Sequence, residues 1–177
     1  NLSVRLGFTA EMAARNAKQA KDDAKSKGKI RLLPPELSHI NTVKSYYEDT
    51  SVNEFESRVL SAFQLSTEQQ QNLNLSSEVD DLPSHGVILE STLFYPEGGG
   101  QLGDQGILFQ SSNEVKVLDT RIEGDSIIHL TDGNLLEGDV QGRLKWSRRK
   151  QLMDHHTAVH VVGGSAREIL GSHVWQA

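Results

Sequence analysis

Two histidines four positions apart, His156 and His160, are the residues whose types and spacing most directly suggest chemistry. On a helix, such residues project from one face with their Cβ atoms about 6 Å apart. This spacing suits two imidazoles that bind one zinc ion. Because a bare H-x-x-x-H also arises by chance in a chain with seven histidines, the pair alone leaves zinc binding and coincidence equally open.

A helix expected from about residue 148 to residue 170 must place these two side chains together. His155 is rotated by about 100° on that helix, so we do not expect it to be a ligand. One turn beyond His160, Gly163 and Gly164 either leave room for a substrate or let the helix pack closely on the rest of the protein. Surface or core roles are expected for the scattered His39, His85, His129 and His173.

A glycine-rich stretch lies about sixty residues upstream, between Thr92 and Gly106. Its three consecutive glycines carry no Cβ, so a backbone amide or carbonyl could lie against a ligand. Gln101 follows with a donor and an acceptor on one side chain, and Thr92 shares a side with Phe94 if the segment is extended. The alternative is a glycine-rich barrel corner with an ordinary turn. The three glycines are Gly98, Gly99 and Gly100.

Five basic residues occur within eight positions just before and at the start of the expected helix, with no acidic residue among them. On a chain of net charge −6, such a strip is either a local phosphate-binding surface or a solvated strand end. Beside a zinc and glycine pocket, it fits a nucleic-acid substrate delivered to the metal. The strip consists of Arg143, Lys145, Arg148, Arg149 and Lys150.

The composition of the chain limits its class. Its 36% hydrophobic and 24% charged residues are typical of a soluble globular protein, and no run of eighteen apolar residues suggests a membrane span. The absence of cysteine excludes disulfides and cysteine-bound metal within these 177 residues. Because residue 1 is Asn and the last residues end without an obvious terminator, we expect an excerpt of a longer protein.

The hydrophobic pattern predicts an α+β fold. A helix is expected over residues 9–27 and a short strand at Tyr46-Tyr47, whereas residues 64–81 are expected to form a long loop. Short strands at regular spacing indicate a small antiparallel barrel. They are expected at 55–63, 86–94, 106–110, 114–121, 126–131 and 139–146. The expected domains are a helical lead-in over 1–42, a β-barrel over 43–147 and, over 148–177, the truncated start of an α/β half that carries the histidine pair.

The string Phe94-Tyr95-Pro96-Glu97-Gly98-Gly99-Gly100-Gln101, followed by Gly103-Asp104 and then by His156-Thr157-Ala158-Val159-His160, resembles the editing domain of alanyl-tRNA synthetases. It is similar also to the freestanding alanyl-tRNA editing proteins. The ending, residues 171–177, looks like the continuation in archaeal-type synthetases. The resemblance covers residues 45–177 well and residues 1–40 more loosely. Leu102 stands where the family commonly has proline.

The resemblance implies a cytoplasmic enzyme that hydrolyses mischarged Ser- or Gly-tRNA(Ala). It implies Zn²⁺ bound by His156 and His160 together with a later Cys-x-x-x-His pair, which these 177 residues lack. Gln101 would contact the substrate, and Thr92 would recognise the serine hydroxyl. The ATP- and Mg²⁺-dependent ligase domain of the parent, which attaches alanine to tRNA(Ala), is also absent, so we expect this piece to be inactive alone. A homodimer of the full-length protein is compatible with the family.

Two other classes stay open. A freestanding editing hydrolase would share residues 45–160, and the forty-residue lead-in counts against it. A non-catalytic barrel that binds RNA through the basic strip would make the histidines incidental. Metal content separates this second class from the editing enzymes.

Overall fold

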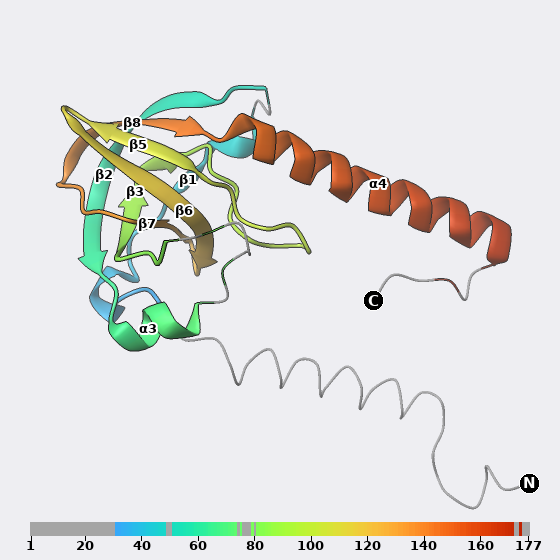
Figure 1. Cartoon of the computed structure of the whole chain (residues 1–177), viewed down its shortest axis with the longest axis horizontal. Coiled ribbons are helices and arrows are strands. Elements are labelled where there is room, and N and C mark those ends of the chain that lie inside the picture. Colours follow the sequence, from blue (N-terminus) through green and yellow to red (C-terminus); the bar gives the residue numbers. More distant parts are fainter. Residues whose placement is uncertain are drawn as a thin grey trace, which may run out of the picture. The chain divides into compact units, whose positions relative to one another are not determined.

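The computed structural model of the chain describes residues 31–48, 51–73, 75, 79, 81–171 and 174. Contacts divide the chain into residues 1–31 and residues 32–177. The helix expected over residues 9–27 lies outside the described residues. In the second unit the expected α+β class is confirmed: a closed antiparallel barrel is followed by one long helix, α4 (Trp146–Leu170) (Figure 1).

Six strands close the barrel, and each pairs antiparallel with its two neighbours. Around the barrel they are β2 (Glu54–Gln64), β3 (His85–Leu89), β7 (Ser126–Thr131), β6 (Asn113–Glu123), β5 (Gly106–Gln110) and β8 (Gly138–Leu144). Pairing of β2 with β8, from Glu54 opposite Arg143 to Val59 opposite Gly138, closes the ring. A separate parallel pair consists of β1 (Val43–Lys44) and β4 (Ser91–Thr92). The short helices are η1 (Pro35–Leu37), η2 (Ser45–Tyr47) and α3 (Thr67–Asn72).

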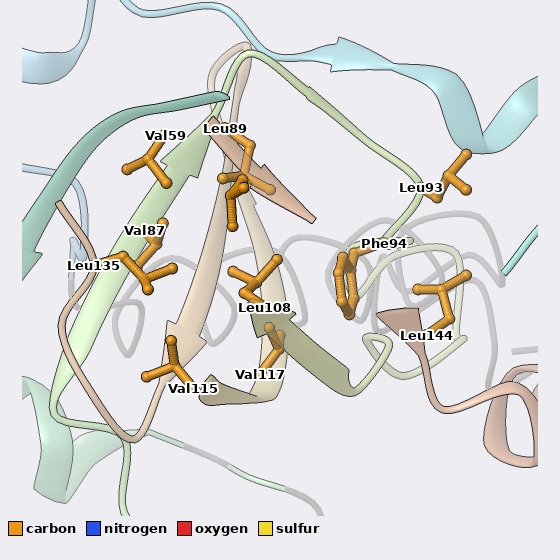
Figure 2. Close-up of a cluster of buried hydrophobic side chains, with 11 residues drawn as sticks. Val59, Val87, Leu89, Leu93, Phe94, Leu108, Val115, Val117, Leu135 and Leu144 are labelled. Carbon is orange, nitrogen blue, oxygen red and sulfur yellow. The ribbon is translucent and has the colours of Figure 1, made fainter. Parts of the chain in front are cut away.

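The barrel has an inner and an outer apolar cluster, and strand β3 contributes to both. Val87 and Leu89 point inward, whereas Ile88 between them joins the outer cluster, because successive side chains of a strand alternate between its faces. Figure 2 shows the inner cluster, in which Phe94 lies near Leu144 beside the barrel strands. Phe94 is fully buried, so the chain that leads into the glycine-rich stretch is fixed in the core.

Leu32 and Leu33 cover the outer cluster together with Leu65, Ile128 and Leu130. Their backbone amides donate to the two carboxylate oxygens of Glu123 at 2.7 and 3.0 Å. Residues 32–33, which the sequence assigns to the lead-in, therefore pack with the barrel. None of the helices among the described residues is long and apolar enough to span a membrane.

Three local predictions are wrong. Residues 46–47 lie in the 3-10 helix η2, where the rings of Tyr46 and Tyr47 pack with centroids 4.5 Å apart; a strand would send them to opposite faces. The expected long loop contains α3, which begins with a capping box: the Ser66 hydroxyl accepts from the Gln69 amide, and the Ser66 amide donates to the Gln69 side chain. The expected strand 86–94 is split into β3 and β4.

Candidate functional site

The glycine-rich stretch forms a hairpin of residues 95–104, called here the glycine hairpin. At its base the amide of Asp104 donates to the carbonyl of Tyr95 at 2.9 Å. At its tip Gly98 and Gln101 exchange two backbone hydrogen bonds of 3.0 and 2.9 Å. The two arms are therefore held in register from base to tip, and Gln101 stands beside the turn.

Gly99 and Gly100 form the two-residue turn, with φ of +59° and +84°. Positive φ at both central residues is typical of the type I′ turn, which strongly prefers glycine and asparagine. No atom lies within 4 Å of the position that a Cβ would take on either residue, so conformation, not space, requires glycine here. The backbone of this turn therefore accounts for these two glycines, and both are exposed.

The base of the hairpin is buried against strand β6. A Cβ on Gly103 would overlap Asp119 and the backbone of Thr120, so this position admits only glycine. The amide of Glu97 donates to the carbonyl of Thr120 at 2.8 Å, and the Thr120 hydroxyl donates to the carbonyl of Asp104 at 2.9 Å. Both arms are thus fastened to one residue of the barrel.

Ion pairs surround this base. Arg121 pairs with Glu97 on the hairpin and with Asp119 on its own strand, where its Nη2 lies 2.6 Å from Oδ2. Burial raises the pKa of Asp119 from 3.8 to about 6, and the amide of Thr120 and the charge of Arg148 offset part of that effect. Burial also lowers the pKa of Arg121.

Thr92 lies before the hairpin, at the end of β4, and it has no exposed surface. Its hydroxyl lies 2.8 Å from Nε2 of His129 and accepts the amide of Phe94 at 3.1 Å. A substrate can reach this hydroxyl only if neighbouring side chains move. The assignment of Thr92 to the pocket stays a prediction.

Gln101 lies at the half-buried edge of the hairpin tip, beside the exposed Gly99 and Gly100. Among the residues that the structure describes, none forms a hydrogen bond with its side-chain amide. This amide can therefore take a donor or an acceptor from a ligand without giving up a described protein contact.

His156 and His160 lie on α4, as expected, and their rings touch. The two Nε2 atoms are 2.9 Å apart and the ring centroids 4.6 Å apart. Two nitrogens bound to one tetrahedral zinc at 2.0–2.1 Å stand about 3.3 Å apart, so opening the pair by a few tenths of an ångström would admit the ion. The pair therefore fits half of a zinc site. No group of three or more possible metal-binding side chains occurs among the described residues.

The five residues of the basic strip lie in different environments. Arg148 and Arg149, 6% and 4% exposed, are buried beneath the start of α4. Arg143 and Lys150 are exposed and form ion pairs with Glu54 and Asp154 at 2.8 and 2.7 Å. Lys145 is exposed as well, so three of the five side chains lie where a phosphate can reach them.

Three residues near or at the base of the hairpin were not identified from the sequence as parts of a site: His129, Asp104 and Arg121. Each acts through a partner distant in sequence, such as Thr92 thirty-seven residues from His129 and Arg149 forty-five residues from Asp104. The string Gly103-Asp104 within the motif was the only signal that pointed toward any of them.

The sequence of this chain is similar to a known protein family and to several known proteins. Residues 2–146 match the family described as tRNA synthetases class II (A), and the match ends where α4 begins. The chain is 39% identical over 151 residues to an alanine–tRNA ligase of Metallosphaera sedula, covering 84% of this chain and 14% of the relative. It is 52% identical over 93 residues, 51% of this chain and 10% of the relative, to that of Hyperthermus butylicus. Over 160 residues it is 37% identical to that of Ignicoccus hospitalis, covering 87% of this chain and 15% of the relative.

The chain therefore belongs to the class II (A) tRNA synthetase family. Within this family, the relatives above are all alanine–tRNA ligases, which confirms the resemblance that the two motifs carry. The chain spans about a seventh of the length of the first of these relatives.

Proposed function

We propose that this chain is the editing region of an alanine–tRNA ligase whose parent protein attaches alanine to tRNA(Ala) with ATP. The observation that carries the proposal is the similarity to alanine–tRNA ligases over 84–87% of the chain. The reaction of this region is hydrolysis of Ser- or Gly-tRNA(Ala). We place the parent in the cytoplasm, where tRNA is charged for protein synthesis.

Ester hydrolysis needs a water held against the carbonyl and a group that fixes the terminal nucleotide. Gln101, whose amide has no described protein partner, is suited to hold that water through its donor and acceptor groups. The exposed Gly99 and Gly100 leave the approach to it free of side chains. These residues supply position, which by itself contributes a large part of many rate enhancements.

His156 and His160 are the residues that would hold Zn²⁺, with further ligands from the parent protein. Bound zinc would supply Lewis acidity and a fixed point for the terminal adenosine. The absence of side chains at Gly163 and Gly164, one turn beyond His160, leaves room for this end of the tRNA. Both glycines have no atom within 4 Å of a Cβ position.

The acceptor stem of tRNA is proposed to pass over the exposed members of the basic strip: Arg143, Lys145 and Lys150. Each phosphate contact releases condensed counterions, so replacing Arg143 and Lys145 by Ala should reduce the slope of log K against log salt by about two units at most. The buried Arg148 and Arg149 lie beneath this surface and support it. An unchanged slope would show that the exposed strip is only a solvated surface.

A deacylation assay with the full-length ligase tests the proposed function. His156→Ala should slow hydrolysis of Ser-tRNA(Ala) and Gly-tRNA(Ala) together, because it removes a ligand that both substrates depend on. His155→Ala is the matched control, since it removes an exposed imidazole next in sequence but about 100° around the helix. Hydrolysis that survives His156→Ala at the rate of the control would overturn the proposal.

A further inference from the structure

Arg149 joins helix α4 to the base of the glycine hairpin through a buried ion pair. Its Nε donates to Oδ2 of Asp104 at 2.8 Å, and its Nη2 donates to the same oxygen and to the carbonyl of Leu93 at 2.5 Å. The side chains of Arg149 and Asp104 are 4% and 1% exposed. The planar guanidinium makes several hydrogen bonds in a fixed geometry, so it fixes the position of the carboxylate as well as neutralising its charge.

Asp104, held by Arg149, is in turn hydrogen-bonded to the opposite arm of the hairpin. The same oxygen, Oδ2, accepts the backbone amide of Tyr95 at 2.7 Å, while the Asp104 amide donates to the carbonyl of Tyr95. One carboxylate therefore ties together the two arms of the hairpin and the first turns of α4. Because Arg149, Asp104 and Leu93 are buried, the bonds between them cannot be exchanged for bonds to water unless the base opens.

Arg149, His156 and His160 lie on one stripe of α4. At about 100° per residue, positions seven and eleven residues after Arg149 fall within about 20° of it around the helix axis. Since Arg149 points toward the hairpin base, the two histidines face the hairpin side of the helix. The hairpin arm from Asp104 to Gly100 spans about 13 Å and His156 lies about 10 Å along the helix from Arg149, so the tip can reach the level of the histidines.

We propose that Arg149 is a positioning residue for the editing reaction, a role that rests on the proposed function. Through Asp104 it sets the angle and distance between the hairpin tip, which carries Gln101, and the histidine face of α4. It touches neither substrate nor metal. Its effect is on the geometry in which the water and the terminal nucleotide meet.

Spin labels measure this geometry directly, because the chain contains no cysteine and accepts a clean pair of new ones. Leu102 on the hairpin and Val161 on α4 are 42% and 61% exposed, and both are replaced by Cys and labelled. We expect one narrow distance distribution in the labelled chain that carries no further substitution. Arg149→Met and Asp104→Asn should broaden or shift it, and Arg149→Lys should restore part of it. Arg143→Met, which removes an exposed ion pair of the same type, should leave it unchanged.

A distribution unchanged by Arg149→Met in a chain that still unfolds cooperatively would overturn the proposal. If Arg149→Met does not fold, Asp104→Asn and Arg149→Lys decide in the same way. In the full-length ligase, Arg149→Lys should lower kcat for Ser-tRNA(Ala) hydrolysis by up to about 100-fold with little change in KM, as expected for lost orientation. The label distances require no tRNA, so they test the positioning role even if His156→Ala disproves the editing function.

Discussion

The hydroxyl of Thr92 lies 2.8 Å from Nε2 of His129, and both residues are fully buried. Nδ1 of His129 lies 3.0 Å from the carbonyl oxygen of Val87, which can only accept, so Nδ1 carries the ring proton. Nε2 is then the acceptor, and Thr92 gives its only proton to His129. Because Thr92 already accepts the amide of Phe94, a substrate hydroxyl could engage it only by donating to the remaining lone pair.

Thr92→Val keeps the shape of the side chain but leaves Nε2 of His129 buried without a donor. We expect a loss of about 1–3 kcal/mol in the free energy of unfolding of this chain, the usual cost of an unsatisfied buried polar group. Thr92→Ser retains the hydroxyl and should lose less. Urea unfolding of the three proteins gives the comparison, and equal stability of the Val and Ser variants would disprove the pairing.

The same substitution in the full-length ligase tests whether Thr92 also recognises serine. If its hydroxyl accepts the serine proton, Thr92→Val should slow Ser-tRNA(Ala) hydrolysis by roughly tenfold or more, the kinetic equivalent of about 1.5 kcal/mol. It should also narrow the gap between serine and alanine substrates, because the hydrogen bond that favours the serine hydroxyl is then absent. Equal slowing of both substrates would make Thr92 a structural residue only.

Asp119 and His129 make opposite contributions to the pH dependence of stability. Burial raises the pKa of Asp119 from 3.8 to about 6, so its stabilisation is lost as the pH rises through that range. Burial lowers the pKa of His129 from 6.5 to about 4, so its stabilisation is lost as the pH falls through that range. Near pH 5 each group changes proton binding by about 0.9 on unfolding, with opposite signs, so the two slopes nearly cancel.

Replacing one of the two groups at a time should reveal how the other makes the free energy of unfolding depend on pH. Asp119→Asn should make the free energy of unfolding rise with pH by about 1.2 kcal/mol per unit near pH 5, relative to the parent chain. His129→Gln should make it fall by a similar amount. Denaturant unfolding between pH 4 and 6.5 provides both slopes. If the free energy of unfolding depends on pH in the same way in the unsubstituted chain and in both variants, these two groups do not titrate as buried groups.

Much of the barrel could be predicted from the sequence because its strands carry local signals. Strand β7 occupies the predicted residues 126–131, and β2, at Glu54–Gln64, extends the predicted 55–63 by one residue at each end. The alternation of Phe55, Ser57 and Val59 with charged residues is sufficient to identify a half-buried strand. Helix α4 was likewise predicted within two residues of its start.

The interior of the candidate site could not be predicted in the same way. The basic residues between 143 and 150 look alike in sequence, yet Arg149 is buried by an acid forty-five residues away and Lys150 is exposed beside Asp154. A fully buried histidine such as His129 has no sequence pattern of its own, because its partners Thr92 and Val87 come from other strands. Such pairs follow from the closed barrel, which brings distant strands together.

Alanine substitutions in the hairpin turn test whether backbone conformation, and not lack of room for a Cβ, requires glycine there. Gly99 and Gly100 have positive φ, whereas Gly98 does not and would make only an ordinary contact with a Cβ. Gly99→Ala or Gly100→Ala should destabilise the hairpin by about 1–2 kcal/mol, and Gly98→Ala should have a smaller effect. Amide hydrogen exchange at Gly98 and Gln101, whose amides close the tip, measures the change. Equal protection in all three variants would contradict the turn assignment.

Zinc binding by the histidine pair is the prediction that most directly separates an editing domain from a simple RNA-binding barrel. Two imidazoles leave half of a tetrahedral ion to water, so this chain should bind zinc weakly. A zinc titration followed by NMR should shift the ring signals of His156 and His160 and leave those of His155 in place. His156→Ala and His160→Ala should each weaken binding, and His155→Ala should not.

The geometry of the pair gives the reason for expecting all three results. The Nε2 atoms of His156 and His160 already stand 2.9 Å apart, so the ion needs only a small opening of the rings, while His155 points to another side of α4. A later Cys-x-x-x-His pair, supplied by a longer chain, would complete the tetrahedron and should tighten binding strongly. If the longer chain, purified folded and without chelators, carries no zinc, the histidines serve another purpose. Zinc binding of equal strength in the His155→Ala and His156→Ala variants of this chain would also show that the histidine pair does not hold zinc.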